Sequence, residues 1–214
     1  MKFDNECILR EEDHKYLTKN GEIIKLPSAT ALVNLIYPFP AMKIDPNILK
    51  LGQIRGTHLH GNMQVYLTLG IDAQCCESKT HAKYYAQAKV LWDKLVKDLE
   101  LDEVYSELPL YNTWYCGTLD VLAHSKKLDK WIIADFKSTS WAVAKTRDDM
   151  EKILNKESLQ LYLYSNLIKE LGVEDFFIIN PNKNQCYKLD SQHLALAKWN
   201  FKFIMDYLKE MRKK

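Results

Sequence analysis

Glycine and proline are scarce in this chain, whose 214 residues include only 7 glycines and 6 prolines. Their scarcity excludes a collagen-like repeat, a low-complexity linker and a long disordered segment. No apolar run approaches the roughly 18 residues that a membrane-spanning helix needs. The chain also lacks an excess of charge of either sign, because 30 basic and 28 acidic residues leave a net charge of +2. This balance argues against nucleic-acid binding through bulk charge but leaves room for a local basic groove.

The five cysteines form neither a CxxC pair nor a zinc-binding spacing. An odd number of scattered cysteines is typical of a reducing compartment. The first fifteen residues contain no apolar segment of a secretory signal, and they are too acidic for a mitochondrial presequence. We therefore expect a cytoplasmic protein with no membrane partner.

Hydrophobic residues make up 47% of the chain, which is enough for a sizeable core in a domain of this length. The chain shows no tandem repeat and no linker, so we expect a single domain over residues 1–214. Within it, a hairpin and helices are expected over 1–100, an αβ core over 101–190 and a final helix over 191–214.

The N-terminal residues predict a hairpin and a short helix. Residues 15–26 read as two strands, and Asn20-Gly21 supplies the two positive φ angles that a type I′ turn requires. Ser28 or Thr30 can cap the apolar helix that follows, which is expected to reach Ile36.

A longer helix is predicted over residues 48–69, with Asp45-Pro46 as its N-cap and first position. This segment contains three glycines, and each costs a helix about 1 kcal/mol relative to alanine. Either a break near Gly56-Thr57 or the close approach of a substrate would explain them.

Further along, the period of the apolar residues separates helices from strands. The expected helices cover residues 79–99 and 157–171, with Gly172 ending the second, and a last helix begins at a Ser191 cap. The expected strands cover residues 104–110, 115–123, 131–136, 176–179 and 185–189. The run at 131–134 is apolar throughout, which favours a central strand covered on both faces. The order predicts an α/β fold with a mixed sheet.

Two carboxylates and an ammonium are expected to meet at one edge of this sheet. Asp120 lies in the second strand of the meander and Asp135 at the end of the third, so a turn brings the two strands side by side. Asp135 and Lys137 are two residues apart and point to the same side. Carboxylate oxygens at this density suit Mg²⁺ or Mn²⁺. A lone Asp-x-Lys is also common as a pair of solvated charges at a strand end.

The surrounding motifs favour a functional site. They are Gly56-Thr57-x-x-His60, Gly117-x-x-Asp120, Asp135-x-Lys137 and Gln160-x-x-x-Tyr164. In this order they resemble the RecB-type nuclease domains of the PD-(D/E)xK superfamily, over residues 15 to 180. The hairpin, Leu26-Pro27-Ser28-Ala29-Thr30 and the residues around Asp135 are more narrowly similar to compact phage and mitochondrial-genome-maintenance exonucleases. The resemblance implies a restriction-endonuclease-like core, with a mixed sheet flanked by helices.

The resemblance also implies roles for individual residues. His60, Asp120 and Asp135 would bind the metal together with the carbonyl group of Phe136, and Lys137 would be the catalytic lysine. Two further residues, Gln160 and Tyr164, would position the scissile strand or support the metal site. A last carboxylate, Glu107, lies on the first strand of the core, where it would line the site as a candidate ligand of a second metal.

Two histidines compete for the metal in the first motif. His58 and His60 are about 200° apart on a helix, so both cannot face one ion. The register of the motif selects His60, and His58 is then expected to be an ordinary, partly buried polar residue.

Nucleic acid would be contacted by residues around this site. The candidates are Arg55, Thr57, Lys145 and Trp141, together with Gln160 and Tyr164. Trp141 follows Lys137 in a polar segment and could stack on an unpaired base, a contact worth roughly 1–3 kcal/mol. The basic residues between 145 and 156 could equally form a solvated face.

The resulting expectation is a Mg²⁺-dependent deoxyribonuclease, with Mn²⁺ as a substitute, acting as an exonuclease in DNA repair or recombination. Its partner would be DNA that is single-stranded or has free ends. The alternatives are a structure-specific endonuclease and a non-catalytic nucleic-acid-binding protein on the same fold. Relatives with an iron–sulfur cluster have one cysteine before the core and three clustered after it. This chain has Cys7 early and only Cys186 late, so no iron–sulfur cluster is expected.

Overall fold

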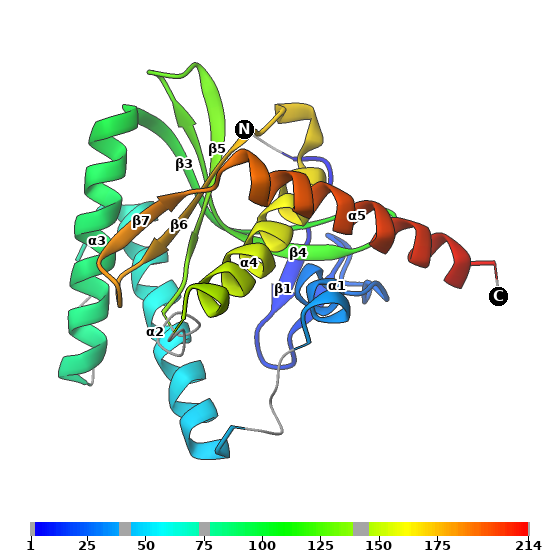
Figure 1. Cartoon of the computed structure of the whole chain (residues 1–214), viewed down its shortest axis with the longest axis horizontal. Coiled ribbons are helices and arrows are strands. Elements are labelled where there is room, and N and C mark those ends of the chain that lie inside the picture. The colour runs from blue at the N-terminus through cyan, green and yellow to red at the C-terminus, as the bar shows by residue number, and fades with distance from the viewer. Residues whose placement is uncertain (1–2, 39–43, 73–77, 139–145, 214) are drawn as a thin grey trace.

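A five-stranded sheet forms the centre of the molecule (Figure 1). The computed structural model describes residues 3–38, 44–72, 78–138 and 146–213. The strands, in their spatial order, are β3 (Leu101–Tyr111), β4 (Cys116–Ser125), β5 (Lys130–Phe136), β6 (Asp175–Asn180) and β7 (Gln185–Lys188). β5 and β6 pair in parallel, whereas the other neighbouring strands are antiparallel. The predicted α/β fold with a mixed sheet is confirmed.

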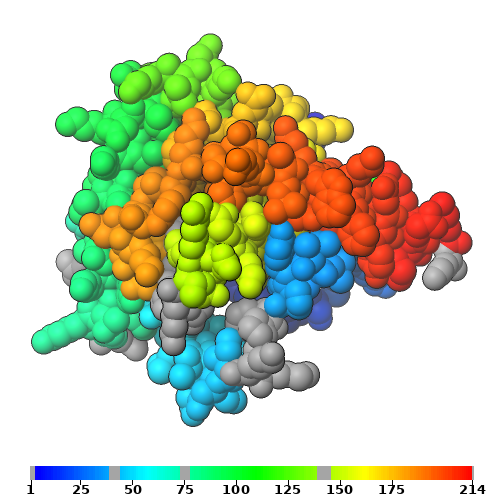
Figure 2. Space-filling model, viewed as in Figure 1, coloured from blue at the N-terminus to red at the C-terminus, as the bar shows by residue number. Residues whose placement is uncertain are grey.

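Helices cover both faces of this sheet. They are α1 (Ala29–Ile36), α2 (Pro46–Leu69), α3 (Lys79–Leu99), α4 (Arg147–Leu167), the short 3₁₀ helix η3 (Lys169–Leu171) and α5 (Ser191–Met211). α2 and α3 contribute to one apolar cluster, and α1, α4 and α5 contribute to the other. Figure 2 shows α1, α4 and α5 next to one another on one face. Within the described residues, no helix is both long and apolar enough to cross a membrane.

β5 is the central strand and is covered on both faces, as its apolar run predicts. Ile132, Ile133 and Ala134 are fully buried. Because successive side chains of a strand alternate between faces, Ile133 packs in the cluster of α4 while its two neighbours pack in the cluster of α3. Burial of this kind contributes about 1.5–3 kcal/mol for each large aliphatic side chain.

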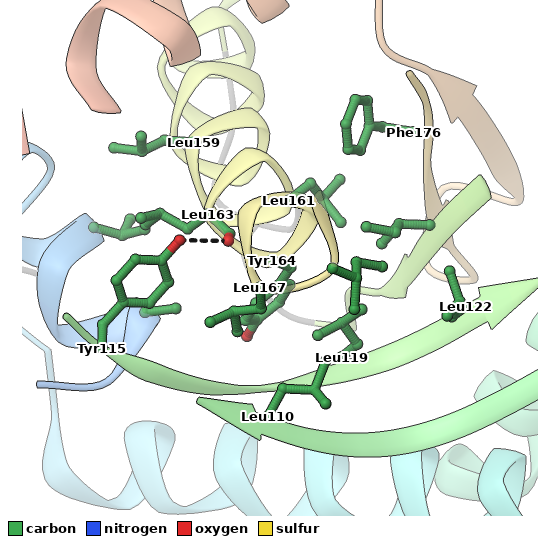
Figure 3. Close-up of a cluster of buried hydrophobic side chains, with 14 of the residues drawn as sticks. Leu110, Tyr115, Leu119, Leu122, Leu159, Leu161, Leu163, Tyr164, Leu167 and Phe176 are labelled. Carbon is green, nitrogen blue, oxygen red and sulfur yellow. Dashed lines mark hydrogen bonds between the residues drawn. The ribbon is translucent and has the colours of Figure 1, made fainter. Parts of the chain in front are cut away.

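The cluster beneath α4 also contains a polar anchor (Figure 3). The fully buried Tyr115 precedes β4, and its hydroxyl donates to the carbonyl oxygen of Leu163 on α4 at 2.8 Å. Leucines from β3, β4 and α4 belong to the same apolar cluster. A buried phenol without such a partner would be costly, so this bond fixes how α4 lies on the sheet.

The N-terminal hairpin differs from its prediction. The two named strands are β1 (Ile8–Arg10) and β2 (Lys15–Leu17), which pair antiparallel. The expected hairpin over residues 15–26 exists only as a short second pairing, in which Leu17 and Ile23 form an isolated bridge. β2 therefore lies between β1 and the segment around Ile23 and pairs with both. The sequence did not predict β1 because this strand is only three residues long.

The turn of this second pairing is not type I′. Gly21 has φ +83°, but Asn20 is not among the residues with positive φ. The amide of Gly21 donates to the carbonyl of Thr18, whose own amide donates to the carbonyl of Glu22. This pattern is that of a type I turn closed by a glycine bulge, which needs one left-handed residue instead of two.

α2 is continuous, so a break near Gly56-Thr57, the first of the two explanations offered for its glycines, is wrong. The helix begins where predicted, with Asp45 accepting a hydrogen bond from the amide of Asn47. Two of its residues, Leu59 and Met63, are buried against α3, and this packing offsets the cost of the glycines.

α4 begins ten positions before its predicted start, at Arg147 rather than residue 157. A capping box causes this, because the side chains of Thr146 and Asp149 each accept a hydrogen bond from the other's backbone amide. The helix ends at Leu167, and the η3 turn leads to Gly172, which has the left-handed φ of +58° that was predicted.

The cap of α5 also differs from its prediction by one residue. The side chain of Asp190, not of Ser191, accepts hydrogen bonds from the amides of Gln192 and His193.

Candidate active site

Three carboxylates lie in a row across β3, β4 and β5. The β3–β4 register places Glu107 opposite Asp120. On the other side of β4, Val121 and Ala134 form the last pair with β5, and Asp120 and Asp135 are the residues directly beyond it. Directly opposite positions on neighbouring strands are only about 4.5–5.5 Å apart at their Cβ atoms. The sheet register therefore concentrates negative charge at one point.

His60 on α2 approaches this row. Its Nδ1 atom lies 3.2 Å from Oε1 of Glu107 and 3.3 Å from Oδ2 of Asp120. Ligand atoms from these three residues all lie within 4.8 Å of one another, and they form a group that could hold a metal ion in the described part of the chain. Burial disfavours the imidazolium, but the charges of Asp120 and Glu107 outweigh it and raise the pKa of His60 to about 9.

Glu107 has an unusual backbone for a strand residue. Its φ of +47° lies in the left-handed region, which residues other than glycine rarely adopt. A conformation of this kind costs of the order of 1–3 kcal/mol and persists where the surrounding structure enforces it. The neighbours of Glu107 on β3, Ser106 and Leu108, keep their register with β4. The irregular backbone is therefore confined to Glu107, which faces Asp120.

Asp120 is oriented by the neighbouring strand. Its Oδ2 atom accepts a hydrogen bond of 2.8 Å from the amide of Phe136. Burial raises the pKa of Asp120, and the charge of Glu107 adds to this effect, while His60 and Lys137 oppose it. The ring of Phe136 is buried near that of Trp92. Metal binding by the carbonyl group of Phe136 stays a prediction.

Lys137 lies among acceptors from β5 and α4. Its Nζ atom is 2.9 Å from Oδ2 of Asp135, as the two-residue spacing predicts, and 3.2 Å from Oε2 of Glu157. It also donates to Oε1 of Gln160 at 2.9 Å. Burial disfavours the ammonium, but the neighbouring carboxylates, Asp135 first, raise the pKa of Lys137 well above its ordinary value. The side chain is therefore positively charged at neutral pH.

Asp135 and Glu157 are almost completely buried, with side-chain exposures of 3% and 5%. Burial is the main cause that raises the pKa of both, and for Asp135 the charge of Asp120 helps to bring the value to about 6. Carboxylates crowd this site more than its cationic groups can neutralise. A bound cation would relieve the excess charge.

Gln160 and Tyr164 lie one turn apart on α4 and support Lys137. Nε2 of Gln160 donates to the hydroxyl of Tyr164 at 2.8 Å and to Oγ1 of Thr30 at 3.4 Å. Tyr164 is buried, and its ring fills the space beside Gly117, where an added Cβ would lie 2.8 Å from it. Of the two predicted roles, this geometry favours support of the site over contact with a nucleic acid strand.

Arg55 and Thr57 lie on α2 near this site. The guanidinium of Arg55 stacks over the ring of Tyr84 at 5.0 Å, and its buried Nε has no hydrogen-bond partner among the described residues. Thr57 is exposed and lines an open cavity with His58. Their predicted contacts with nucleic acid stay predictions. Trp141 and Lys145 lie outside the described residues.

His58 points away from the carboxylates. Its Nδ1 atom lies 3.0 Å from Nδ1 of His81 on α3, with the two rings edge to face. The two histidines of the first motif thus face different neighbours, as their helical spacing requires.

Glu157 is the site residue that the sequence analysis missed. It was expected only as the first residue of a helix. Its spacing of three residues from Gln160, on the same helical face, was a signal that could have found it.

No family model and no curated protein matches this chain. Among solved structures, a phage-related exonuclease from Haemophilus somnus 129PT is 12% identical, with a TM-score of 0.33 over 88% of this chain and 95% of that one. A protein designated SSO0001 is 14% identical, with a TM-score of 0.29 over 59% of this chain and 61% of its own. Scores this low do not establish a common fold, so the site has to be interpreted from its own residues.

Proposed function

We propose that this protein is a divalent-metal-dependent nuclease that hydrolyses phosphodiester bonds in DNA as an exonuclease. One observation carries the proposal. His60, Glu107 and Asp120 form a potential metal-binding group, and Asp135, the next carboxylate of the row, holds the ammonium of Lys137 together with the buried Glu157. Grouped acids of this kind with one ammonium suit a reaction at a phosphate, in which both a cation and a fixed positive charge are needed.

The donor set fits a hard divalent cation. Carboxylate oxygens of Glu107 and Asp120 are ligands that Mg²⁺ and Mn²⁺ accept, and the imidazole of His60 adds a nitrogen ligand that suits Mn²⁺. Asp135 lies next in the row and would join them. Such an ion, when bound, lowers the pKa of a water ligand and offsets charge on the phosphate.

Lys137 would stabilise charge as the reaction proceeds. Glu157 and Gln160 hold its ammonium beside Asp135, so the charge is positioned before a substrate arrives. Positioning of this kind acts most strongly on negative charge that develops in the transition state. The side chain remains partly accessible, with an exposure of 20%, so a phosphate can approach it.

The direct test uses an end-labelled single-stranded oligonucleotide and a circular single strand, each incubated with Mg²⁺, with Mn²⁺ and with EDTA. An exonuclease degrades the linear strand in the presence of metal and leaves the circle intact. Opening of the circle would favour the endonuclease alternative. Binding without cleavage in both metals would contradict the proposal and favour a non-catalytic nucleic-acid-binding protein.

Asp135→Asn and Asp175→Asn provide a matched pair for this assay. Asp175 is an acidic strand residue on β6 that pairs with Lys188 outside the site. We expect Asp135→Asn to abolish cleavage and Asp175→Asn to leave it unchanged. Because the pKa of Asp135 is raised from its ordinary value of 3.8 to about 6 in the folded protein, stability is lost as the pH rises between these two values, and the loss is complete at pH 7. Asp135→Asn should therefore not lower the melting temperature at pH 7 in EDTA.

A further inference from the structure

The outer face of α5 carries a row of large apolar side chains. Trp199, Phe203, Tyr207 and Met211 follow one another at intervals of four residues, which places them on one ridge of the helix. Their exposed fractions are 67%, 57%, 42% and 52%. The opposite face of α5 packs into the core, where Ile204 is fully buried.

This row extends over most of the helix and toward its free end. In Figure 1 the C-terminal half of α5 runs outward beyond the sheet. Single exposed apolar residues are ordinary on protein surfaces, but a contiguous patch of aromatic residues is typical of an interaction surface. Aromatic residues and methionine are also the types enriched in protein interfaces.

A charged row lies directly beside the apolar one. Lys198, Lys202, Asp206 and Glu210 are exposed and also follow at intervals of four. The two positive charges occupy the N-terminal half of the row and the two negative charges occupy the C-terminal half. Asp206 and Glu210 already form ion pairs with Lys209 and Lys213, respectively. Both pairs are exposed and therefore weak, so the two carboxylates can change to other partners at little cost.

We propose that the outer face of α5 binds the same face of a second copy of this chain, with the two helices antiparallel. In an antiparallel pair related by a two-fold axis, each flanking row meets its own copy in reverse order. Lys198 then faces Glu210 of the partner, and Lys202 faces Asp206 of the partner. Phe203 lies near the axis, with Trp199 opposite Tyr207 of the partner.

Charge complementarity selects this occupant and this orientation. A parallel pair related by a two-fold axis would turn the two charged rows to opposite sides of the interface, where their charges could not pair. The antiparallel pair makes every charge of the row face an opposite one, around an apolar centre. Exposed charges of this kind determine orientation, while burial of the aromatic row supplies the affinity. The inference does not depend on the proposed nuclease function, because the candidate active site contains no residue of α5.

The first test measures the mass of the protein in solution by sedimentation equilibrium over a range of concentrations. We expect a dimer for the wild type and a monomer for Phe203→Asp, which places two carboxylates near the axis. Val90→Asp is the matched control, because Val90 is 64% exposed on α3, away from this face. A wild type that is monomeric at every concentration, or equal dissociation of both variants, would overturn the proposal.

A charge exchange tests the orientation. The variant K198E/K202E makes the row wholly acidic, and D206K/E210K makes it wholly basic. Each should raise the dimer dissociation constant by about tenfold or more, and an equimolar mixture should restore dimers containing one of each. The fourfold variant K198E/K202E/D206K/E210K should dimerise like the wild type, because reversal of all four charges keeps every facing pair of the antiparallel dimer oppositely charged. If the mixture or the fourfold variant failed to dimerise, the antiparallel arrangement would be contradicted. Dimers in the mixture would also show that each of the two variants is folded.

Discussion

The ammonium of Lys137 lies 3.2 Å from the carboxylate of Glu157, although one residue follows β5 and the other belongs to α4. Both side chains are largely buried, and Asp135 lies on the other side of the ammonium. α4 therefore does more than cover the sheet. It determines where the ammonium of Lys137 points.

Replacement of Glu157 should separate positioning from stability. Glu157→Gln keeps the shape of the side chain but removes the charge beside Lys137, so we expect slower cleavage with little change in fold. Glu157→Ala also leaves a gap and an unpaired buried group, at a cost of about 1–3 kcal/mol. Thermal melting and single-turnover cleavage distinguish the two effects. Full activity of both variants would contradict a positioning role.

His60 should make the metal-free protein sensitive to pH. Its folded pKa of about 9 lies above the ordinary value of 6.5, so its stabilising contribution is complete below 6.5 and is lost as the pH rises through 9. We expect the melting temperature in EDTA to fall over this range, and His60→Gln to lack that part of the decrease.

The same titration should affect metal binding. A metal ligand must be the neutral imidazole, so the affinity for Mn²⁺ should rise with pH up to about 9, with release of a proton. His58→Gln is the control, because His58 contacts His81 instead of the carboxylates. Equal losses of Mn²⁺ affinity in the two histidine variants would show that His60 has no special role.

Lys137→Ala should lower the cleavage rate by about a hundredfold or more while leaving DNA binding in Ca²⁺ nearly unchanged. Lys137→Arg should not restore activity, because a planar guanidinium does not fit acceptors arranged around a compact ammonium. Lys130→Ala is a matched control at the opposite end of β5, where the lysine pairs with Glu174 at the surface. Single-turnover rates decide the matter, and normal cleavage by Lys137→Ala would identify the lysine as an ordinary strand-end charge.

Gly117→Ala should destabilise the fold because the added methyl group would lie 2.8 Å from Cε1 of Tyr164. Overpacking of this kind costs about 1–3 kcal/mol. A double-mutant cycle with Tyr164→Leu should show coupling, since the smaller side chain makes room. Gly61→Ala is the control, because a Cβ there meets nothing within 4 Å, and it should stabilise α2 by about 1 kcal/mol. Equal destabilisation by both alanines would contradict this explanation.

The sequence predicted the sheet well because its strands are long and apolar. β4 and β5 appeared within two residues of their bounds, and the positions of Asp120 and Asp135 on neighbouring strands followed from the turn between them. The proximity of Asp135 and Lys137 followed from the two-residue period alone.

Other features depended on contacts that no local pattern encodes. The β1–β2 pairing involves strands of three residues, which are too short for a visible period. The burial of Glu157 results from how α4 lies on the sheet, although its spacing of three residues from Gln160 placed it on the same helical face. The early start of α4 was readable in principle, since Thr146 and Asp149 have the spacing of a capping box.

α4 is also the connection between the two parallel strands, β5 and β6. Its middle turns bury Leu159, Leu161 and Leu163 completely, and the site residues Glu157 and Gln160 alternate with them. This part of the helix cannot open by itself without exposing the core, so we expect it to be among the most slowly exchanging parts of the molecule. Loss of the site on heating should then coincide with global unfolding, with no folded intermediate in which α4 is released.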